Sequence, residues 1–145
     1  MLYPLWMCRR VTVLWLCVLC LIASGPACAQ VDRLNALITS GQTDKPALDQ
    51  LLTSLSEEQR EQCVAALVTH LESSDWRHRE AAAYVAGQLG PKAGPIARQL
   101  IKAMACDMSN VAWEVAPALG KIGAAAVPAV IDELKACQAL PDKVG

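Results

Sequence analysis

Side chains able to bind a metal are scarce in this sequence. The two histidines, His70 and His78, are eight residues apart and are followed by Leu71 and Arg79. Two histidines make a metal site only when the fold adds carboxylate or thiolate ligands to them. We therefore expect both histidines to be surface or helix-end residues, and we expect the protein to bind no metal ion.

Three cysteines follow residue 29, and they fit neither a haem site nor a disulfide scaffold. Cys63, Cys106 and Cys137 lie in stretches expected to be helical, and the sequence has no Cys-x-x-Cys-His motif. A bridge between Cys106 and Cys137 would require two helix ends to converge, because packed helix axes lie ~8–10 Å apart and bridged Cα atoms about 5.5–6 Å apart. A glycine-rich phosphate loop is absent as well. The sequence therefore predicts no catalytic residue and no cofactor.

The first 29 residues have the pattern of a secretory signal peptide. A basic pair at 9–10 precedes an apolar stretch at 11–23, and a small-x-small sequence follows at 27–29. The apolar stretch is shorter than the ~20 residues of a membrane-spanning helix. Cleavage would leave residues 30–145 as one exported domain, in the periplasm, in the medium or on the outer face of the membrane. Without cleavage, the leader would be a membrane anchor.

Residues 31–138 show helical periodicity and a repeat of 33 residues. The recurring positions are Gly87, Gly90 and Pro95, matched by Gly120, Gly123 and Pro128. Apolar residues recur at i, i+3, i+4 and i+7, so that each helix has one apolar stripe to be covered by a neighbour. No segment alternates with period two for long enough to indicate a strand. A fixed period of this length is typical of a solenoid of stacked helical pairs.

Apolar spacing and helix caps together give the element boundaries. We expect a half repeat at 31–40 and then three pairs of helices, 45–55 with 57–72, 76–89 with 94–105, and 111–122 with 126–138. Ser56 and Gln59 have the spacing of a capping box, and Asp75 is an N-cap candidate. Gly90 and Gly123 suit the left-handed position just past a helix end.

The two clearest repeats resemble HEAT repeats. Residues 79–90 resemble the first helix of such a repeat, residues 115–123 are similar, and residues 126–130 resemble the usual start of a second helix. The short HEAT-like repeats of phycobilin lyase subunits are the most similar variety. The resemblance covers 75–137, and Ala112 stands where HEAT repeats often have a basic residue. It implies an all-α fold, a right-handed α-solenoid (α-α superhelix) of about three pairs plus the half repeat. The His-Glu dipeptides that bind iron in HEAT-like deoxyhypusine hydroxylases are absent.

In HEAT families the second helices line a concave side that commonly binds other proteins. The resemblance therefore implies a mixed-charge binding strip, whose candidate residues here are Arg98, Gln99, Lys102, Asp132, Glu133 and Lys135. Tyr84 lies off the apolar stripe of its helix and is the candidate for an exposed aromatic contact. Trp76 and Trp113 are expected either to cover the seam between repeats or to anchor a partner.

These features predict a non-catalytic protein-binding scaffold or accessory subunit. After cleavage the domain would carry 11 Lys and Arg against 14 Asp and Glu, and it lacks the basic footprint of a nucleic-acid-binding protein. The partner is expected to be a protein. Two alternatives stay open: an enzyme subunit that handles a bilin or another tetrapyrrole, which the resemblance to the lyases implies, and a structural protein tethered to the membrane by an uncleaved leader.

Overall fold

A computed structural model of the 145-residue chain describes residues 26–40, 44–106 and 110–138. These segments are helical and contain no β-strand, which confirms the predicted all-α class. The elements are α2 (Pro26–Thr39), α3 (Lys45–Ser54), α4 (Glu57–Leu71), α5 (Trp76–Leu89), the 3₁₀-helix η1 (Gly90–Ile96), α6 (Ala97–Cys106), α7 (Asn110–Ile122), the 3₁₀-helix η2 (Gly123–Ala126) and α8 (Val127–Gln138). Most of the expected leader lies outside the described residues. Cleavage after Ala29 would remove the first turn of α2.

Local side-chain chemistry determines where several helices begin and end. Ser56 Oγ accepts the backbone N–H of Gln59 at 3.3 Å, and Gln59 Oε1 accepts the backbone N–H of Ser56 at 2.8 Å, which is the predicted capping box of α4. The Asp75 carboxylate caps α5. Gly90 and Gly123 have φ angles of 61° and 64°. The ψ angle of −137° places Gly90 outside the left-handed helical region that the sequence predicted.

The second helix of the middle pair begins later than predicted. The 3₁₀-helix η1 occupies residues 90–96, so that α6 begins at Ala97 instead of residue 94. Pro91 and Pro95 both lie in η1, and neither has a backbone N–H to donate to an α-helical hydrogen bond. The prolines are compatible with this 3₁₀ geometry, and η2 adopts the same geometry from Gly123 without a proline.

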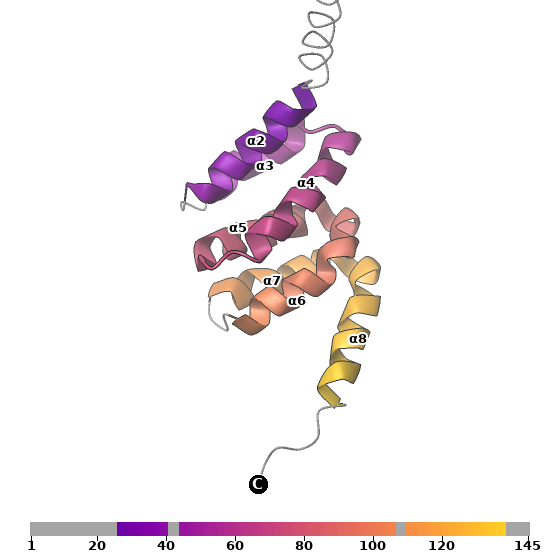
Figure 1. The fold of residues 1–145 in the computed structure, drawn as a ribbon. Helices are drawn as coiled ribbons and strands as arrows, with labels where there is room; N and C mark the ends of the chain where they lie inside the picture. Colours follow the sequence, from indigo (N-terminus) through magenta and orange to yellow (C-terminus); the bar gives the residue numbers. More distant parts are fainter. Residues whose placement is uncertain (1–25, 41–43, 107–109, 139–145) are drawn as a thin grey trace, which may run out of the picture.

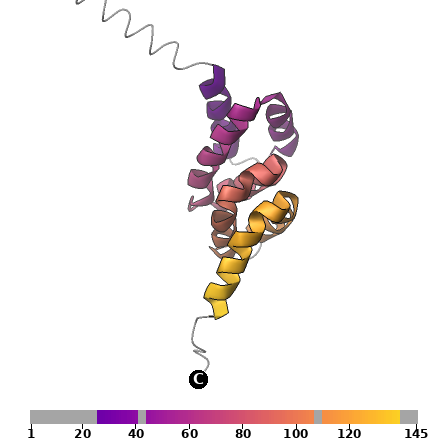
Figure 2. The same cartoon turned by 90° about the vertical axis from the view of Figure 1, so that its right-hand side faces the viewer.

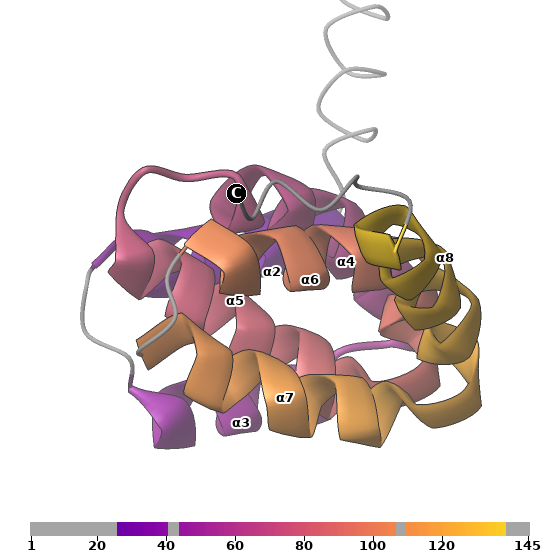
Figure 3. The ribbon, with the colours of Figure 1, turned by 90° about the horizontal axis from the view of Figure 1, so that it is seen from below.

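Helices that are not consecutive in the sequence lie side by side. On one side α3 contacts α5 and α5 contacts α7. On the other side α2 contacts α4, α4 contacts α6 and α6 contacts α8 (Figures 1 and 3). The closest packing joins α5 to α7, followed by α4 to α5 and α6 to α7. The second helices α4 and α6 thus lie mainly against the first helix of the next pair, and less against their own predicted partners. A single core of buried apolar side chains runs from Leu34 in α2 to Ala126 in η2.

Small residues allow successive pairs to approach closely. A Cβ added to Gly87 in α5 would lie 3.0 Å from the Cα atom of Ala118 in α7. A Cβ added to Gly94 in η1 would lie 2.8 Å from the Cβ atom of Ala125 in η2. Both distances are shorter than ordinary carbon contacts of about 3.5–4.0 Å. Glycine at these two positions is therefore a packing requirement.

The last helix is the least buried element of the described chain. Figures 1 and 2 show α8 extending beyond the other helices at the C-terminal end, and none of its residues is buried. By length and composition alone, the stretch Asn110–Gln138 is apolar enough to cross a membrane. It is not one straight helix, because Gly123 interrupts it with a positive φ angle. Burial of Val111, Val115 and Ile122 in the core accounts for the apolar composition of α7.

Candidate binding surface

Six of the seven candidate binding residues lie on α6 and α8, which contact each other. They are Arg98, Gln99 and Lys102 on α6, and Asp132, Glu133 and Lys135 on α8. Arg98 Nη2 donates to Asp132 Oδ2 at 3.0 Å, and Arg98 Nε lies 3.5 Å from Glu133 Oε1. The structure thus brings three of the six together in one ion-pair cluster. Because the cluster is largely exposed, it contributes only about 0–1 kcal/mol to stability.

Gln99 and Lys102 line a hollow of about 220 Å³ between the end of α4 and α6. The other lining residues are Leu71, Glu72, Ser73, Arg79 and Ala103. Gln99 Oε1 is buried and accepts no hydrogen bond from the described residues. Arg79 Nη1 donates to the carbonyl oxygens of Ser73 and Ser74, which holds its guanidinium at the rim. The hollow therefore offers two cations, one carboxylate and one free amide oxygen, a composition suited to a polar side chain.

Tyr84 does not join the other candidate residues. It is half-buried in α5, and its hydroxyl donates to the Asp49 carboxylate of α3 at 2.8 Å. Burial raises the pKa of the Tyr84 hydroxyl, and the hydrogen bond to Asp49 raises it further. The Nζ atoms of Lys45 and Lys121 lie 5.0 and 5.9 Å from the ring centroid. Tyr84 thus contacts side chains of both α3 and α7 from its position in α5.

Lys45 extends this polar cluster to the start of α7. Its ammonium group donates to the Glu114 carboxylate, a contact between residues from two different helix pairs. This hydrogen bond raises the pKa of Lys45, while partial burial acts in the opposite direction. Polar contacts within the chain therefore hold the first helices α3, α5 and α7 together.

The two tryptophans have different environments. Trp76 packs against the core, with the Arg77 guanidinium 4.9 Å from its ring, as expected of a residue that covers the seam between repeats. Trp113 is 80% exposed. The apolar stripe of α7 consists of Val111, Val115, Ala118 and Ile122. Residue 113 is off this stripe, and that spacing was the available signal of its exposure.

The two histidines lie against each other, which the sequence did not predict. Their ring centroids are 6.0 Å apart in an edge-to-face arrangement. His70 Nε2 lies 3.0 Å from Asn35 Oδ1 in α2. Burial lowers the pKa of His70, and the neighbouring His78 lowers it further. Among the described residues, no group of three or more His, Cys, Asp or Glu side chains is placed to hold a metal ion.

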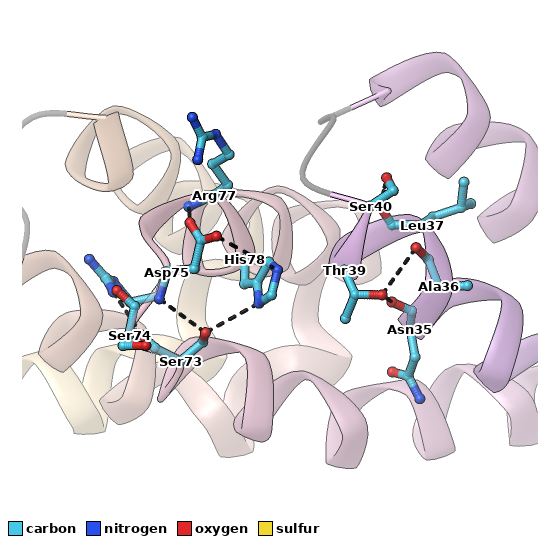
Figure 4. Close-up of polar contacts among 11 residues, drawn as sticks. Asn35, Ala36, Leu37, Thr39, Ser40, Ser73, Ser74, Asp75, Arg77 and His78 are labelled. Atoms are coloured by element: carbon cyan, nitrogen blue, oxygen red, sulfur yellow. Dashed lines mark hydrogen bonds and ion pairs between the residues drawn. The ribbon is translucent and has the colours of Figure 1, made fainter.

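His78 lies between a serine and an aspartate, which are the residue types of a hydrolase triad. His78 Nδ1 is 3.2 Å from Ser73 Oγ, and His78 Nε2 is 4.0 Å from Asp75 Oδ2 (Figure 4). The second distance is too long for the hydrogen bond that orients a catalytic histidine. Ser73 Oγ and Asp75 Oδ1 also accept backbone N–H groups of the turn before α5 and of its first residues. The arrangement therefore serves to cap the helix.

Two of the three cysteines are described as free thiols. Cys63 is fully buried in α4, and burial raises the pKa of its thiol. Cys137 is exposed on α8. Because Cys137 is free, it does not form the bridge to Cys106 that the sequence left open.

The residues and their geometry are the basis for inferring a function. No protein-family model, curated protein or solved structure matches this chain. The likeness of residues 79–90 and 115–123 to HEAT repeats is thus a likeness of short motifs, and the surfaces of the molecule carry the inference of its role.

Proposed function

We propose that this chain is an exported, non-catalytic scaffold or accessory subunit that binds another protein. Its repeat domain, residues 30–145, would be a right-handed HEAT-like α-solenoid, and residues 1–29 would be the export signal. The agreement between the 33-residue period and the packing of α5 on α7 supports the solenoid, because Gly87 and its counterpart Gly120 occupy matching places in successive pairs.

We assign binding to the side formed by the second helices α4, α6 and α8. The observation that carries this assignment is the polar hollow between α4 and α6, which contains two of the residues chosen from the sequence, Gln99 and Lys102. A buried acceptor without a hydrogen bond costs about 1–3 kcal/mol, and a donor from a partner would recover part of this cost. Lys102 and Arg79 would attract a carboxylate or amide side chain into the same hollow.

Comparative affinity capture tests this assignment. The chain would be expressed with its own leader and captured from its native compartment, and the bound proteins would be quantified by mass spectrometry. Lys102→Gln should reduce the yield of a specific partner about 10–100-fold, since hydrogen bonds to charged groups are worth about 1.5–3 kcal/mol. Gln50→Glu, an equal change of charge at an exposed position of α3, is the matched control and should leave the yield unchanged.

Two results would contradict the proposal. Equal yields from the wild type and Lys102→Gln would place the binding site elsewhere on the molecule. Repeated capture of this chain without any partner would remove the scaffold function itself.

A further inference from the structure

Large apolar side chains are exposed at the C-terminal end of the helix stack. Trp113 on α7 is 80% exposed, and Val127, Ile131 and Leu134 on α8 are 49%, 43% and 59% exposed. The three residues of α8 follow at i, i+4 and i+7 and therefore share one face of that helix. We call these four residues, together with Ala116 and Gly120 of α7, the C-terminal face.

The repeat shows what kind of contact the C-terminal face is built for. Ala83 and Gly87 of α5 are buried, and a Cβ at Gly87 would lie 3.0 Å from the Cα atom of Ala118 in α7. Their counterparts 33 residues later are Ala116 and Gly120, and nothing lies within 4 Å of a Cβ added to Gly120. Trp113 precedes these two at i−3 and i−7 and so shares their face of α7. Among residues 26–40, 44–106 and 110–138, no helix covers this packing surface of the last pair.

Substitutions between the repeats make this end more apolar. Gly94 and Arg98 of the middle pair correspond to Val127 and Ile131 of the last pair. A terminal repeat that serves only as a cap needs a polar outer face. Here the position of the exposed Arg98 is occupied by Ile131 in the last pair, which makes the outer face less polar. At the other end of the stack, none of the large exposed apolar side chains belongs to residues 29–39 of α2 or to α3.

We propose that two copies of this chain pack C-terminal face to C-terminal face in a two-fold symmetric dimer. The face offers both protruding side chains, as at Trp113 and Leu134, and open space beside Gly120, which has no side chain, so that a side chain of one copy can lie against Gly120 of the other. Pairing of like ends closes after two copies, whereas pairing an apolar end with the polar opposite end would leave the apolar surface unmatched.

The exposed area is compatible with such a dimer. An aromatic side chain buries about 150–250 Å². With Trp113 largely exposed and three aliphatic side chains about half exposed, the four residues offer on the order of 450 Å² per copy, or roughly 900 Å² in the dimer. Flanking backbone and small side chains on α7 raise the total toward the ~1,200 Å² at which specific interfaces begin. We therefore expect a dissociation constant in the micromolar range, ~1–50 µM.

The charges around the C-terminal face favour a protein surface over a lipid surface. On α7 and α8 the two basic residues, Lys121 and Lys135, are accompanied by three acidic residues, Glu114, Asp132 and Glu133, so these helices carry no excess of positive charge. Helices that lie in a membrane interface instead carry an excess of Lys and Arg on their polar side. The surrounding charges therefore fit a second copy, which brings the same balanced set.

Sedimentation equilibrium of the protein purified in the form that the cell produces tests the dimer. The wild type should change from monomer to dimer mass between ~1 and 100 µM. Leu134→Glu should remain monomeric over this range, whereas the control Gln50→Glu should associate as the wild type does. Gly120→Leu, which would keep the partner away from the backbone of α7, should also be monomeric while retaining the helical circular dichroism of the wild type, because the new side chain has open space in the monomer.

Three outcomes would overturn the proposal. A wild type that stays monomeric at 100 µM excludes the dimer, and if deletion of residues 139–145 then restores association, the tail of the same chain covers the face. A dimer that survives both Leu134→Glu and Gly120→Leu uses another surface. Binding of the monomer to anionic phosphatidylserine vesicles, abolished by Leu134→Glu, would assign the face to a membrane.

Discussion

Replacement of two glycines that occupy matching places in successive pairs tests the stacking directly. Gly87→Ala and Gly120→Ala are the same chemical change in the interior of the first helices α5 and α7. In an isolated helix each would stabilise by about 0.5–1 kcal/mol, because alanine loses less backbone entropy than glycine. Any difference between them therefore measures their tertiary environments.

The structure sets the sign and size of that difference. The new Cβ at position 87 would lie 3.0 Å from Cα and 3.1 Å from Cβ of Ala118, and at least one of these is a rigid backbone atom. Overpacking of a tight contact costs about 1–3 kcal/mol, so Gly87→Ala should be destabilised by a net ~0–2 kcal/mol. Nothing lies within 4 Å at position 120, so Gly120→Ala should be stabilised by the full 0.5–1 kcal/mol.

Urea unfolding followed by circular dichroism at 222 nm gives both free energies. The protein concentration should be ~0.1 µM, well below the expected dissociation constant, so that self-association does not contribute. The two variants should differ by about 1–3 kcal/mol, with Gly120→Ala the more stable and the wild type between them or close to Gly87→Ala. Equal stabilisation by both would refute the close approach of α5 and α7. Equal destabilisation would show that position 120 is packed in the monomer and is not at an open end.

Three further predictions follow from the burial of single side chains. Leu100→Ala, at a fully buried position of α6, should lower the free energy of unfolding by about 2–5 kcal/mol in urea titrations, while the neighbouring exposed Lys102→Ala should change it by less than about 0.5 kcal/mol. In the native protein a maleimide reagent should modify Cys137 and leave Cys63 unmodified until urea unfolds the chain, as read by peptide mass spectrometry. The pKa of His70 is lowered by folding, so the unfolded chain takes up the proton first and stability should fall as pH drops below ~6.5; His70→Gln should flatten this dependence in unfolding curves at pH 5–7.5.

Helix positions followed from the sequence because they depend on local signals. Ser56 and Gln59 form their capping box within four residues, and Asp75 caps its own helix. The stripe of α6 also indicated the buried side, although Leu100 is fully buried there and Ile101 only half-buried. An i, i+3, i+4, i+7 pattern gives the direction of a stripe to within one residue, and the neighbouring helices decide which of its members is fully covered.

The contacts between helices could not be predicted from the sequence, because they depend on how far and in which direction each pair is displaced from the one before it. The spacing of His70 and His78 gave no indication that their rings meet, since one closes α4 and the other opens α5. Tyr84 was correctly placed off the stripe of its helix, but Lys45 and Asp49 of α3 reach it from another pair. Contacts between side chains of different helix pairs produce no periodic pattern in the sequence.

A comparison of the two repeats shows which features the sequence determines and which depend on the position of a pair in the stack. Gly87 and Gly120 are the same residue at the same phase of the 33-residue period, yet one lies against Ala118 and the other has no neighbour within 4 Å. Periodicity therefore encodes a packing surface on every pair, and only the presence of a next pair determines whether that surface is buried. The C-terminal face, where Arg98 of the middle pair is replaced by Ile131, keeps the packing surface and strengthens its apolar character. A surface made for helix packing and left without a helix is where a second protein chain gains most by docking.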